Sequence, residues 1–116
     1  GLTRSARVRL ADAQKEGLHL ESRFDLAYNA AHALALAALR WHGYRSDTRY
    51  LVFQCLRHTV ALPPEEWRVL EAAHRKRNLA EYEGEIDVDT AVVEGLIRVA
   101  RHVDELLAAL GPPKVD

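Results

Sequence analysis

The chain has 116 residues, a length that corresponds to one compact domain rather than two. Its 16 lysines and arginines are balanced by 17 aspartates and glutamates, so no overall basic field favours nucleic acid or an acidic membrane. Alanine and leucine together supply 35 residues, whereas glycine supplies 6 and proline 4. This composition favours helices over a sandwich or barrel, which needs more turn residues and β-branched strands.

Cysteine and histidine usage argues against several classes of site. Cys55 is the only cysteine, which leaves no disulfide framework or thiolate zinc site, and we expect a reducing cytoplasm as the location. No two histidines are three or four residues apart, so we expect no metal and no cofactor. No apolar run approaches the ~20 residues that span a bilayer, residues 1–16 lack the pattern of a signal peptide, and we expect no membrane contact.

In chain order, residues 3–17 predict a first, weakly patterned helix, with Val8, Ala11 and Leu18 facing inward and Gly17 as its end. Residues 21–42 carry the strongest pattern and predict a long amphipathic helix that ends at Gly43. Its apolar residues recur at three- and four-residue steps: Phe24, Ala27, Tyr28, Ala31, Leu34, Ala35, Ala38 and Trp41.

The second half predicts a turn at 44–47 and a short helix at 50–56, because an isolated strand there would have no partner. A helix from Pro64 to about Ala80 follows, then a polar connection around Gly84. Asp89 is placed to cap a last helix over 90–110, in which Gly95 permits a close helix crossing. Its expected inward residues are Val92, Val93, Leu96, Ala100, Val103, Leu107 and Leu110.

Together these elements predict an all-α, up-and-down bundle of four to five antiparallel helices. It forms a single domain over residues 1–116, with an ordered core at about 3–110 and a tail at 111–116.

A polar row continues the apolar face of the 64–80 helix. His74, Arg77, Asn78 and Glu81 follow Trp67 and Leu70 on that face. Because arginine is rarely buried without a partner, either Arg77 pairs with Glu81 or the row lines a groove or a subunit interface.

The cationic residues near this row have two interpretations. The run from His74 to Arg77 could contact phosphates, with Arg40, Arg45 and Arg49 as possible additions. A basic last turn would equally complement the negative end of the helix dipole.

The segment Arg77-Asn78-Leu79-Ala80-Glu81-Tyr82-Glu83-Gly84 resembles the signature region of HEPN domains (higher eukaryotes and prokaryotes nucleotide-binding). The stretches 24–33 and 39–45 are similar to the long second helix and turn of that family, so the resemblance covers roughly residues 20–110. It implies a helical bundle that forms a homodimer, with two copies of the signature across a shared cleft. It also implies that Arg77 and Asn78 correspond to the signature arginine and its polar neighbour.

The chain departs from the family at the catalytic position. Active members are metal-independent endoribonucleases in which four to six residues separate the signature arginine from a histidine, but Tyr82 stands five positions after Arg77, with four residues between them. A phenol, whose pKa is near 10, is a poor general base at neutral pH.

We therefore expect a non-catalytic dimeric module that binds nucleotide or RNA through Arg77 and Asn78, surrounded by His74, Glu81 and Tyr82. The resemblance implies a role beside a nucleotidyltransferase partner in a toxin–antitoxin or defence system. One alternative is a working endoribonuclease that uses Arg77 with His74 or Tyr82 as base. A second is a purely structural dimerisation domain in which the polar row is an interfacial ion-pair network.

Overall fold

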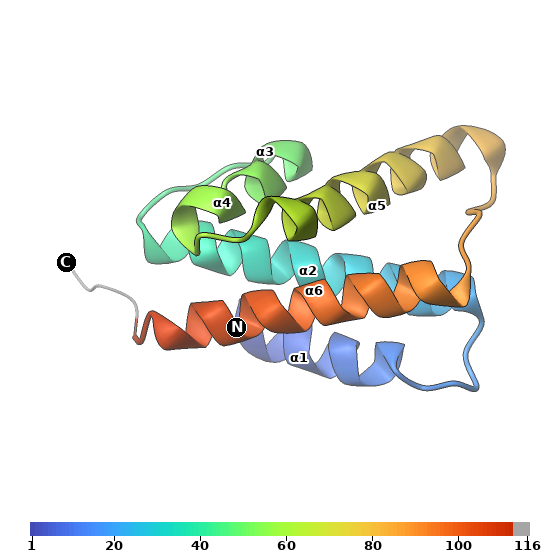
Figure 1. Ribbon diagram of the computed structural model, residues 1–116, viewed down its shortest axis with the longest axis horizontal. Coiled ribbons are helices and arrows are strands. Elements are labelled where there is room, and N and C mark those ends of the chain that lie inside the picture. Colours follow the sequence, from blue (N-terminus) through green and yellow to red (C-terminus); the bar gives the residue numbers. More distant parts are fainter. Residues whose placement is uncertain (113–116) are drawn as a thin grey trace.

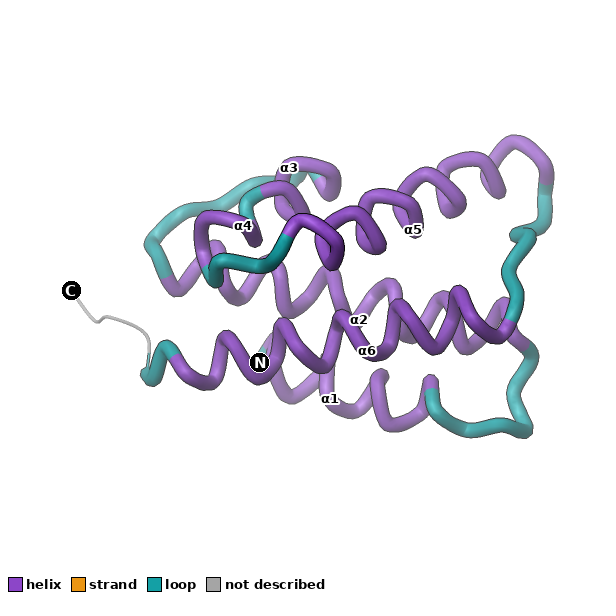
Figure 2. The backbone as a smooth tube through the Cα atoms, viewed as in Figure 1, coloured by secondary structure: helices purple, strands orange, loops and turns teal. Residues whose placement is uncertain are grey.

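The computed structural model describes residues 1–112, which form four long helices and a short helical segment between the second and third of them (Figure 1). In chain order the helices are α1 (Leu2–Ala13), α2 (Leu20–Trp41), α3 (Arg49–Gln54), α4 (Leu56–Thr59), α5 (Pro64–Glu83) and α6 (Thr90–Ala109). The described residues contain no strand, so the predicted all-helical bundle is confirmed. The long helices alternate in direction, and the connections between elements gather at the two ends of the bundle (Figure 2).

The core is built around α2, which packs against α1 on one side and α6 on another. The predicted stripe of α2 is buried from Phe24 to Ala38, and Trp41 is half-buried at its end. Alanines alternate with large side chains along this stripe, so neighbouring helices approach closely at the small positions. On α6, the predicted inward residues between Val93 and Leu107 are buried, while Val92 and Leu110 are partly buried against the same core.

The first helix differs from its prediction. It ends at Ala13 rather than at Gly17, and its buried residues are Ala6, Leu10 and Ala13. The expected inward residues Val8, Ala11 and Leu18 are all exposed. Alanine contributes little to an apolar pattern, yet here two alanines provide the contact surface that lets α1 lie close to the helix beside it.

The segment predicted as one short helix is helical but divided. It begins one residue earlier, at Arg49, is interrupted at Cys55, and continues to Thr59 as α4. Ala61 then adopts a left-handed backbone conformation with φ of 54°, and the Leu62 amide returns to the Leu56 carbonyl at 3.2 Å. This turn buries the Leu62 side chain and directs the chain into α5.

The third long helix begins at Pro64 as predicted and extends to Glu83, beyond the expected end near Ala80. Gly84 ends it in the left-handed conformation, with φ of 81° and its amide donating to the Ala80 carbonyl at 2.8 Å. The second half of α5 leans away from the other long helices (Figure 1). Because of this divergence, a large part of α5 remains outside the apolar core.

The last helix begins as predicted, because the Asp89 carboxylate accepts a hydrogen bond from the Val92 amide at 2.8 Å. Among residues 1–112 no helix crosses closely at Gly95, since a Cβ atom there would have nothing within 4 Å, and a crossing between subunits at this position stays a prediction. Gly111, with φ of 79°, ends the helix region, and the remainder of the predicted tail at 113–116 lies outside the described residues.

Candidate functional site

Three helices bring cationic and aromatic side chains together around the buried ring of Tyr28. We call this set the Tyr28 cluster. Its members are Tyr28 from α2, Arg49, Tyr50 and Phe53 from α3, and His74, Arg77 and Asn78 from α5.

Tyr28 is 1% exposed because it lies on the apolar stripe of α2. Its ring stacks with Phe24 at 6.1 Å between centroids and meets the edge of Phe53 at 5.6 Å. The hydroxyl of a buried tyrosine needs a hydrogen-bond partner, and here that partner is His74 Nδ1 at 3.0 Å. Tyr28 therefore joins the apolar core to the polar row of α5.

Two guanidinium groups lie over the Tyr28 ring. The Cζ atoms of Arg49 and Arg77 are 5.6 Å and 5.3 Å from the ring centroid, within the range of a cation–π contact. Arg77 Nη1 also contacts Asp25 Oδ1 at 3.2 Å, which partly neutralises its charge. Arg49 has no ion pair within the described part of the chain, and its Nη1 is buried there without a hydrogen-bond partner. Arg49 is thus the uncompensated cation of the cluster.

His74 has partners at both ring nitrogens. The Asn78 amide donates to Nε2 at 3.1 Å, which places the ring proton on Nδ1 and lets Nδ1 donate to the Tyr28 oxygen. Burial, followed by the positive charge of Arg49, lowers the pKa of the His74 imidazole below its ordinary value of 6.5. His74 is therefore a neutral imidazole at pH 7.

Another histidine, His32 on α2, has an environment similar to that of His74. His32 is partly buried, and its ring meets the edge of Phe53 at 5.9 Å. Burial and then the charge of Arg49 lower its pKa as well. Arg49 therefore acts electrostatically on both histidines, which is consistent with a positive potential on this side of Tyr28.

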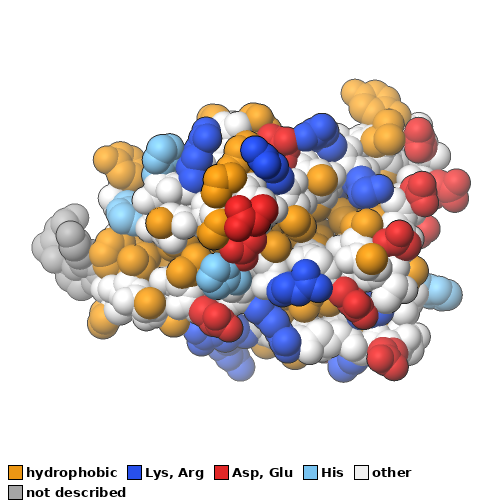
Figure 3. Space-filling model, in the orientation of Figure 1, with side chains coloured by type: hydrophobic (Ala, Val, Ile, Leu, Met, Phe, Trp, Pro, Cys, Tyr) orange, Lys and Arg blue, Asp and Glu red, His pale blue; other side chains and the backbone are white. Residues whose placement is uncertain are grey.

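The opposite side of Arg77 is acidic. A cavity of about 240 Å³ is bordered there by Arg77 and by carboxylates from the start of α2 and the end of α5. The carboxylates are Glu21, Asp25, Glu81 and Glu85. Acidic side chains also gather at the end of the molecule where α5 turns toward α6 (Figure 3). Because these charges repel phosphate, an anion can reach the cluster favourably only from the Arg49 side.

The structure brings together three of the five candidate site residues. His74, Arg77 and Asn78 meet around Tyr28, whereas Glu81 borders the acidic cavity. Arg77 pairs with Asp25 rather than with Glu81, so the i,i+4 pair considered from the sequence does not form. Tyr82 is 90% exposed, and no contact joins it to the cluster among the described residues.

Tyr28 and Arg49 were not among the candidate site residues. The pattern of α2 identified Tyr28 only as a core residue, and Arg49 was one of several arginines that could add to a phosphate site. The contact between Tyr28 and His74 joins residues 46 positions apart, which no periodicity reveals. The one available signal was chemical, because a tyrosine within an alanine-rich buried stripe must direct its hydroxyl to a polar partner.

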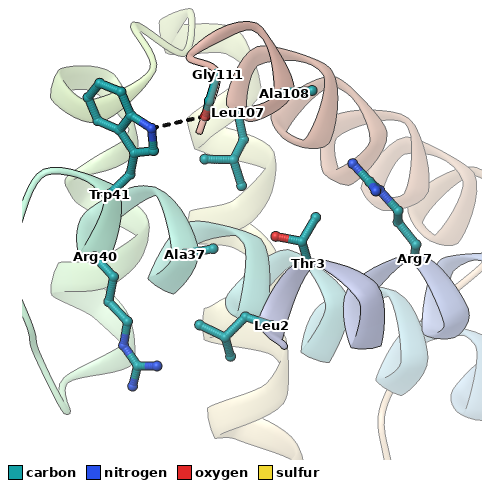
Figure 4. Close-up of a pocket in the computed structure, with 9 residues that line it drawn as sticks. All are labelled: Leu2, Thr3, Arg7, Ala37, Arg40, Trp41, Leu107, Ala108 and Gly111. Atoms are coloured by element: carbon teal, nitrogen blue, oxygen red, sulfur yellow. Dashed lines mark hydrogen bonds between the residues drawn. The ribbon is translucent and has the colours of Figure 1, made fainter. Parts of the chain in front are cut away.

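Another hollow, of about 450 Å³, lies at the end of the bundle where α1, α2 and α6 meet. Leu2, Ala37 and Leu107 converge on it (Figure 4). At its rim the Trp41 indole donates to the Gly111 carbonyl at 3.2 Å. Residues 113–116 follow this rim in the sequence and lie outside the described part of the chain, so we assign no function to the hollow.

Comparison of the chain with family models, curated proteins and solved structures gave no match. No helix within residues 1–112 is long and apolar enough to cross a membrane. In the same part of the chain, no group of three or more histidine, cysteine, aspartate or glutamate residues could hold a metal ion.

Proposed function

We propose that the protein is a HEPN-like module that binds a nucleotide or RNA at the Tyr28 cluster without cleaving it. Arg49 carries this proposal, because its guanidinium is held over Tyr28 with a buried Nη1 and no carboxylate partner among the described residues. A phosphate group would supply the missing negative charge and, once the Arg49 side chain turned toward it, the missing acceptor in a charge-assisted hydrogen bond. Arg77 and Asn78 complete the contact, with His74 between them and the aromatic rings.

An exposed aromatic ring beside the two arginines supports a nucleic-acid ligand over a simple anion. Tyr50 remains partly exposed on α3, 5.8 Å from the His74 ring, and its hydroxyl accepts a hydrogen bond from Gln54 at 2.7 Å. Nucleobases stack on such rings with little dependence on sequence, while arginines hold the backbone phosphates. We infer that a base lies against Tyr50 and its phosphate against Arg49.

Three features favour binding without turnover. The catalytic position of the family signature is occupied by Tyr82, whose side chain is 90% exposed to solvent. Both nitrogens of His74 are engaged in hydrogen bonds, so neither is free to accept a proton from a 2′-hydroxyl. Arg77, the signature arginine, already shares its charge with Asp25.

One observation favours the endoribonuclease as the second candidate function. The imidazole of His74 is neutral at pH 7 and stands beside two guanidinium groups that could stabilise charge on an attacked phosphate. If the Asn78 side chain moved aside, Nε2 would be free to act as a base. In this alternative His74, rather than the exposed Tyr82, takes the base role.

The polar row gives little support to the third candidate function, a purely structural dimerisation domain. Tyr28, Asp25 and Asn78 satisfy His74 and Arg77 inside one chain, so these side chains need no second subunit as partner.

The proposal includes the homodimer that the family resemblance implies. Leu79 and Tyr82 lie three residues apart on α5, and both are exposed. Two large side chains on successive positions of one helix face are suited to contact a second copy. Sedimentation at micromolar concentration tests this point, and a stable monomer would exclude a cleft shared by two subunits. A nucleotidyltransferase partner in a toxin–antitoxin or defence system also belongs to the proposal and would be tested by co-purification.

The binding experiment uses fluorescence anisotropy of a labelled, mixed-sequence single-stranded RNA in EDTA over a series of salt concentrations. We expect Arg49→Gln to weaken binding about tenfold, as removal of a charged hydrogen bond does. The salt dependence of log K should also become shallower by about 0.7 for each phosphate that the variant no longer neutralises. Arg77→Gln should weaken binding in the same direction.

Arg75→Gln is the matched control. Arg75 lies on α5, as Arg77 does, but its side chain is exposed and pairs with Glu71. This variant removes the same charge and should change the affinity less than about twofold, since Arg75 lies outside the cluster. Equal losses for Arg75→Gln and Arg49→Gln, or no binding by the parent protein, would contradict the proposal. RNA fragments made by the parent and absent with Arg77→Gln would establish the endoribonuclease instead.

A further inference from the structure

A separate cavity of about 500 Å³ lies where the end of α2 meets α3 and α4. We call it the Cys55 cavity, and it shares no lining residue with the Tyr28 cluster. Its walls include Leu39, Tyr44, Leu51 and Cys55. A largely apolar hollow of this volume is within the range of about 300–1,000 Å³ that is typical of small-molecule sites.

Two large side chains at this cavity remain in contact with water. Leu51 is 49% exposed and Tyr44 is 65% exposed. Exposure of these two side chains to water beside an apolar hollow is unfavourable. An apolar occupant would remove part of their surface from water.

The titratable side chains of the cavity are cationic or neutral, with no acidic residue among the described ones that line it. Arg45 supplies a full positive charge and has no ion pair in the described part of the chain. His58 lines the same hollow, and His42 donates from Nε2 to the Thr59 carbonyl at 2.9 Å. A single guanidinium without a carboxylate partner matches one carboxylate, which it can hold through two parallel hydrogen bonds.

An unsatisfied polar group lines the cavity as well. Thr59 is 9% exposed, and its hydroxyl has no hydrogen-bond partner among the described residues. Buried hydroxyls are rarely left unpaired, because an unmade hydrogen bond costs free energy. The hydroxyl oxygen is itself buried, so a polar atom of an occupant would become its partner once the Thr59 side chain turned toward the cavity.

We propose that the Cys55 cavity binds a small amphiphilic carboxylate. Its hydrocarbon or aromatic body packs against Leu39, Leu51 and Cys55, and its carboxylate pairs with Arg45. The site is independent of nucleotide or RNA binding, because it shares none of the residues used at the Tyr28 cluster.

Cys55 provides the readout, since it is the only cysteine in the sequence and is partly exposed in the cavity. Octanoate is the probe, and the measurement is the rate at which a thiol reagent labels Cys55. At several times its Kd, octanoate should slow labelling about fivefold through occupancy alone. Octanol, which has the same chain without the charge, should protect Cys55 more weakly.

Arg45→Gln should weaken protection by octanoate about tenfold while leaving protection by octanol unchanged. Arg40→Gln is the matched control, because it removes the same charge nearby but Arg40 lines the other hollow. Circular dichroism of each variant verifies that the helices are intact. Absence of protection by octanoate would overturn the site, and equal protection by octanol or in Arg45→Gln would overturn the carboxylate assignment.

Discussion

Helices α2 and α5 are nearly equal in length, at 22 and 20 residues, yet they are held in the bundle by different forces. Eleven residues of α2 are buried, whereas only Leu70 and Ala73 are buried on α5. The burial of α2 defines the core, and its position follows from apolar packing. The position of α5 depends much more on individual polar contacts.

Two of the polar contacts that hold α5 involve residues of the Tyr28 cluster, His74 and Arg77. His74 reaches Tyr28, Arg77 reaches Asp25, and Lys76 donates to the Asp87 carbonyl at 3.0 Å. A ligand that drew Arg77 away from Asp25 would therefore weaken the attachment of α5. Arg49 forms no ion pair among the described residues. It is therefore the residue best able to bind an anion without loss of stability.

The largest expected effect compares one leucine from each helix. Leu34→Ala on α2 removes a fully buried side chain and should lower the free energy of unfolding by about 2–5 kcal/mol. Leu79→Ala on α5 removes an exposed side chain and should change it within about 0.5 kcal/mol. Urea unfolding of both variants measures the difference. These values refer to the monomer, so the variants are compared at concentrations too low for a dimer. An added loss for Leu79→Ala at higher concentration would come from the proposed dimer contact, whereas a similar loss in the monomer would mean that Leu79 is buried there.

The next effect concerns the end of α5. Gly84→Ala places a side chain where φ is 81° and should cost about 1–2 kcal/mol. Gly95→Ala, inside α6 where a Cβ meets nothing within 4 Å, should instead stabilise the monomer by about 0.5–1 kcal/mol. Thermal unfolding distinguishes the two signs. Destabilisation by Gly95→Ala would indicate that another subunit packs closely against that position.

A pair of tyrosines isolates the polar attachment of α5. Tyr28→Phe removes the hydroxyl that meets His74 and should cost about 1 kcal/mol, since one partly buried hydrogen bond is removed. Tyr82→Phe is the control and should change stability within about 0.5 kcal/mol, because that side chain is 90% exposed. Chemical unfolding with matched denaturant series compares them. An unchanged stability in Tyr28→Phe would mean that this contact does not help to hold α5.

The smallest effect is a pH dependence from the two shifted histidines. The pKa values of His32 and His74 are lowered in the folded protein, so the unfolded chain binds protons first as the pH falls. Stability should therefore be greatest above about pH 6.5 and should decline as the pH falls from there toward the lowered folded pKa values. Melting temperatures between about pH 7.5 and pH 5.5 test this window. His74→Gln should reduce the decline, and an unchanged slope would contradict a lowered pKa of His74.

The sequence predicted the parts of the fold that depend on strong apolar periodicity or on local backbone chemistry. The stripe from Phe24 to Ala38 is buried as expected, and Pro64 and Asp89 begin and cap their helices as expected, whereas α5 continues past its predicted end near Ala80 to Glu83. The weak pattern of α1 selected the wrong face, because alanines rather than Val8 make its contacts. The apolar pattern of a sequence identifies the contact face of a helix only where large side chains form most of the interface.

Less of the candidate site than of the fold could be predicted from the sequence. The row of His74, Arg77 and Asn78 follows from the geometry of one helix, and the structure places these residues together. Their partners Tyr28 and Arg49 come from two other helices, so their roles depend on how the helices pack. Helix packing also determines that Arg77 pairs with Asp25 of α2 rather than with Glu81.

The central claim is that Arg49 and Arg77 bind phosphate at the Tyr28 cluster. The most direct test observes the arginine side-chain Nε–H signals in a proton–nitrogen correlation spectrum while a short single-stranded RNA is added. Conservative Arg→Lys variants assign the signals of Arg49, Arg77 and the exposed Arg75. We predict saturable shifts for Arg49 and Arg77 and none for Arg75. Shifts confined to other arginines, or none at all while the RNA binds, would contradict the site proposed for this protein.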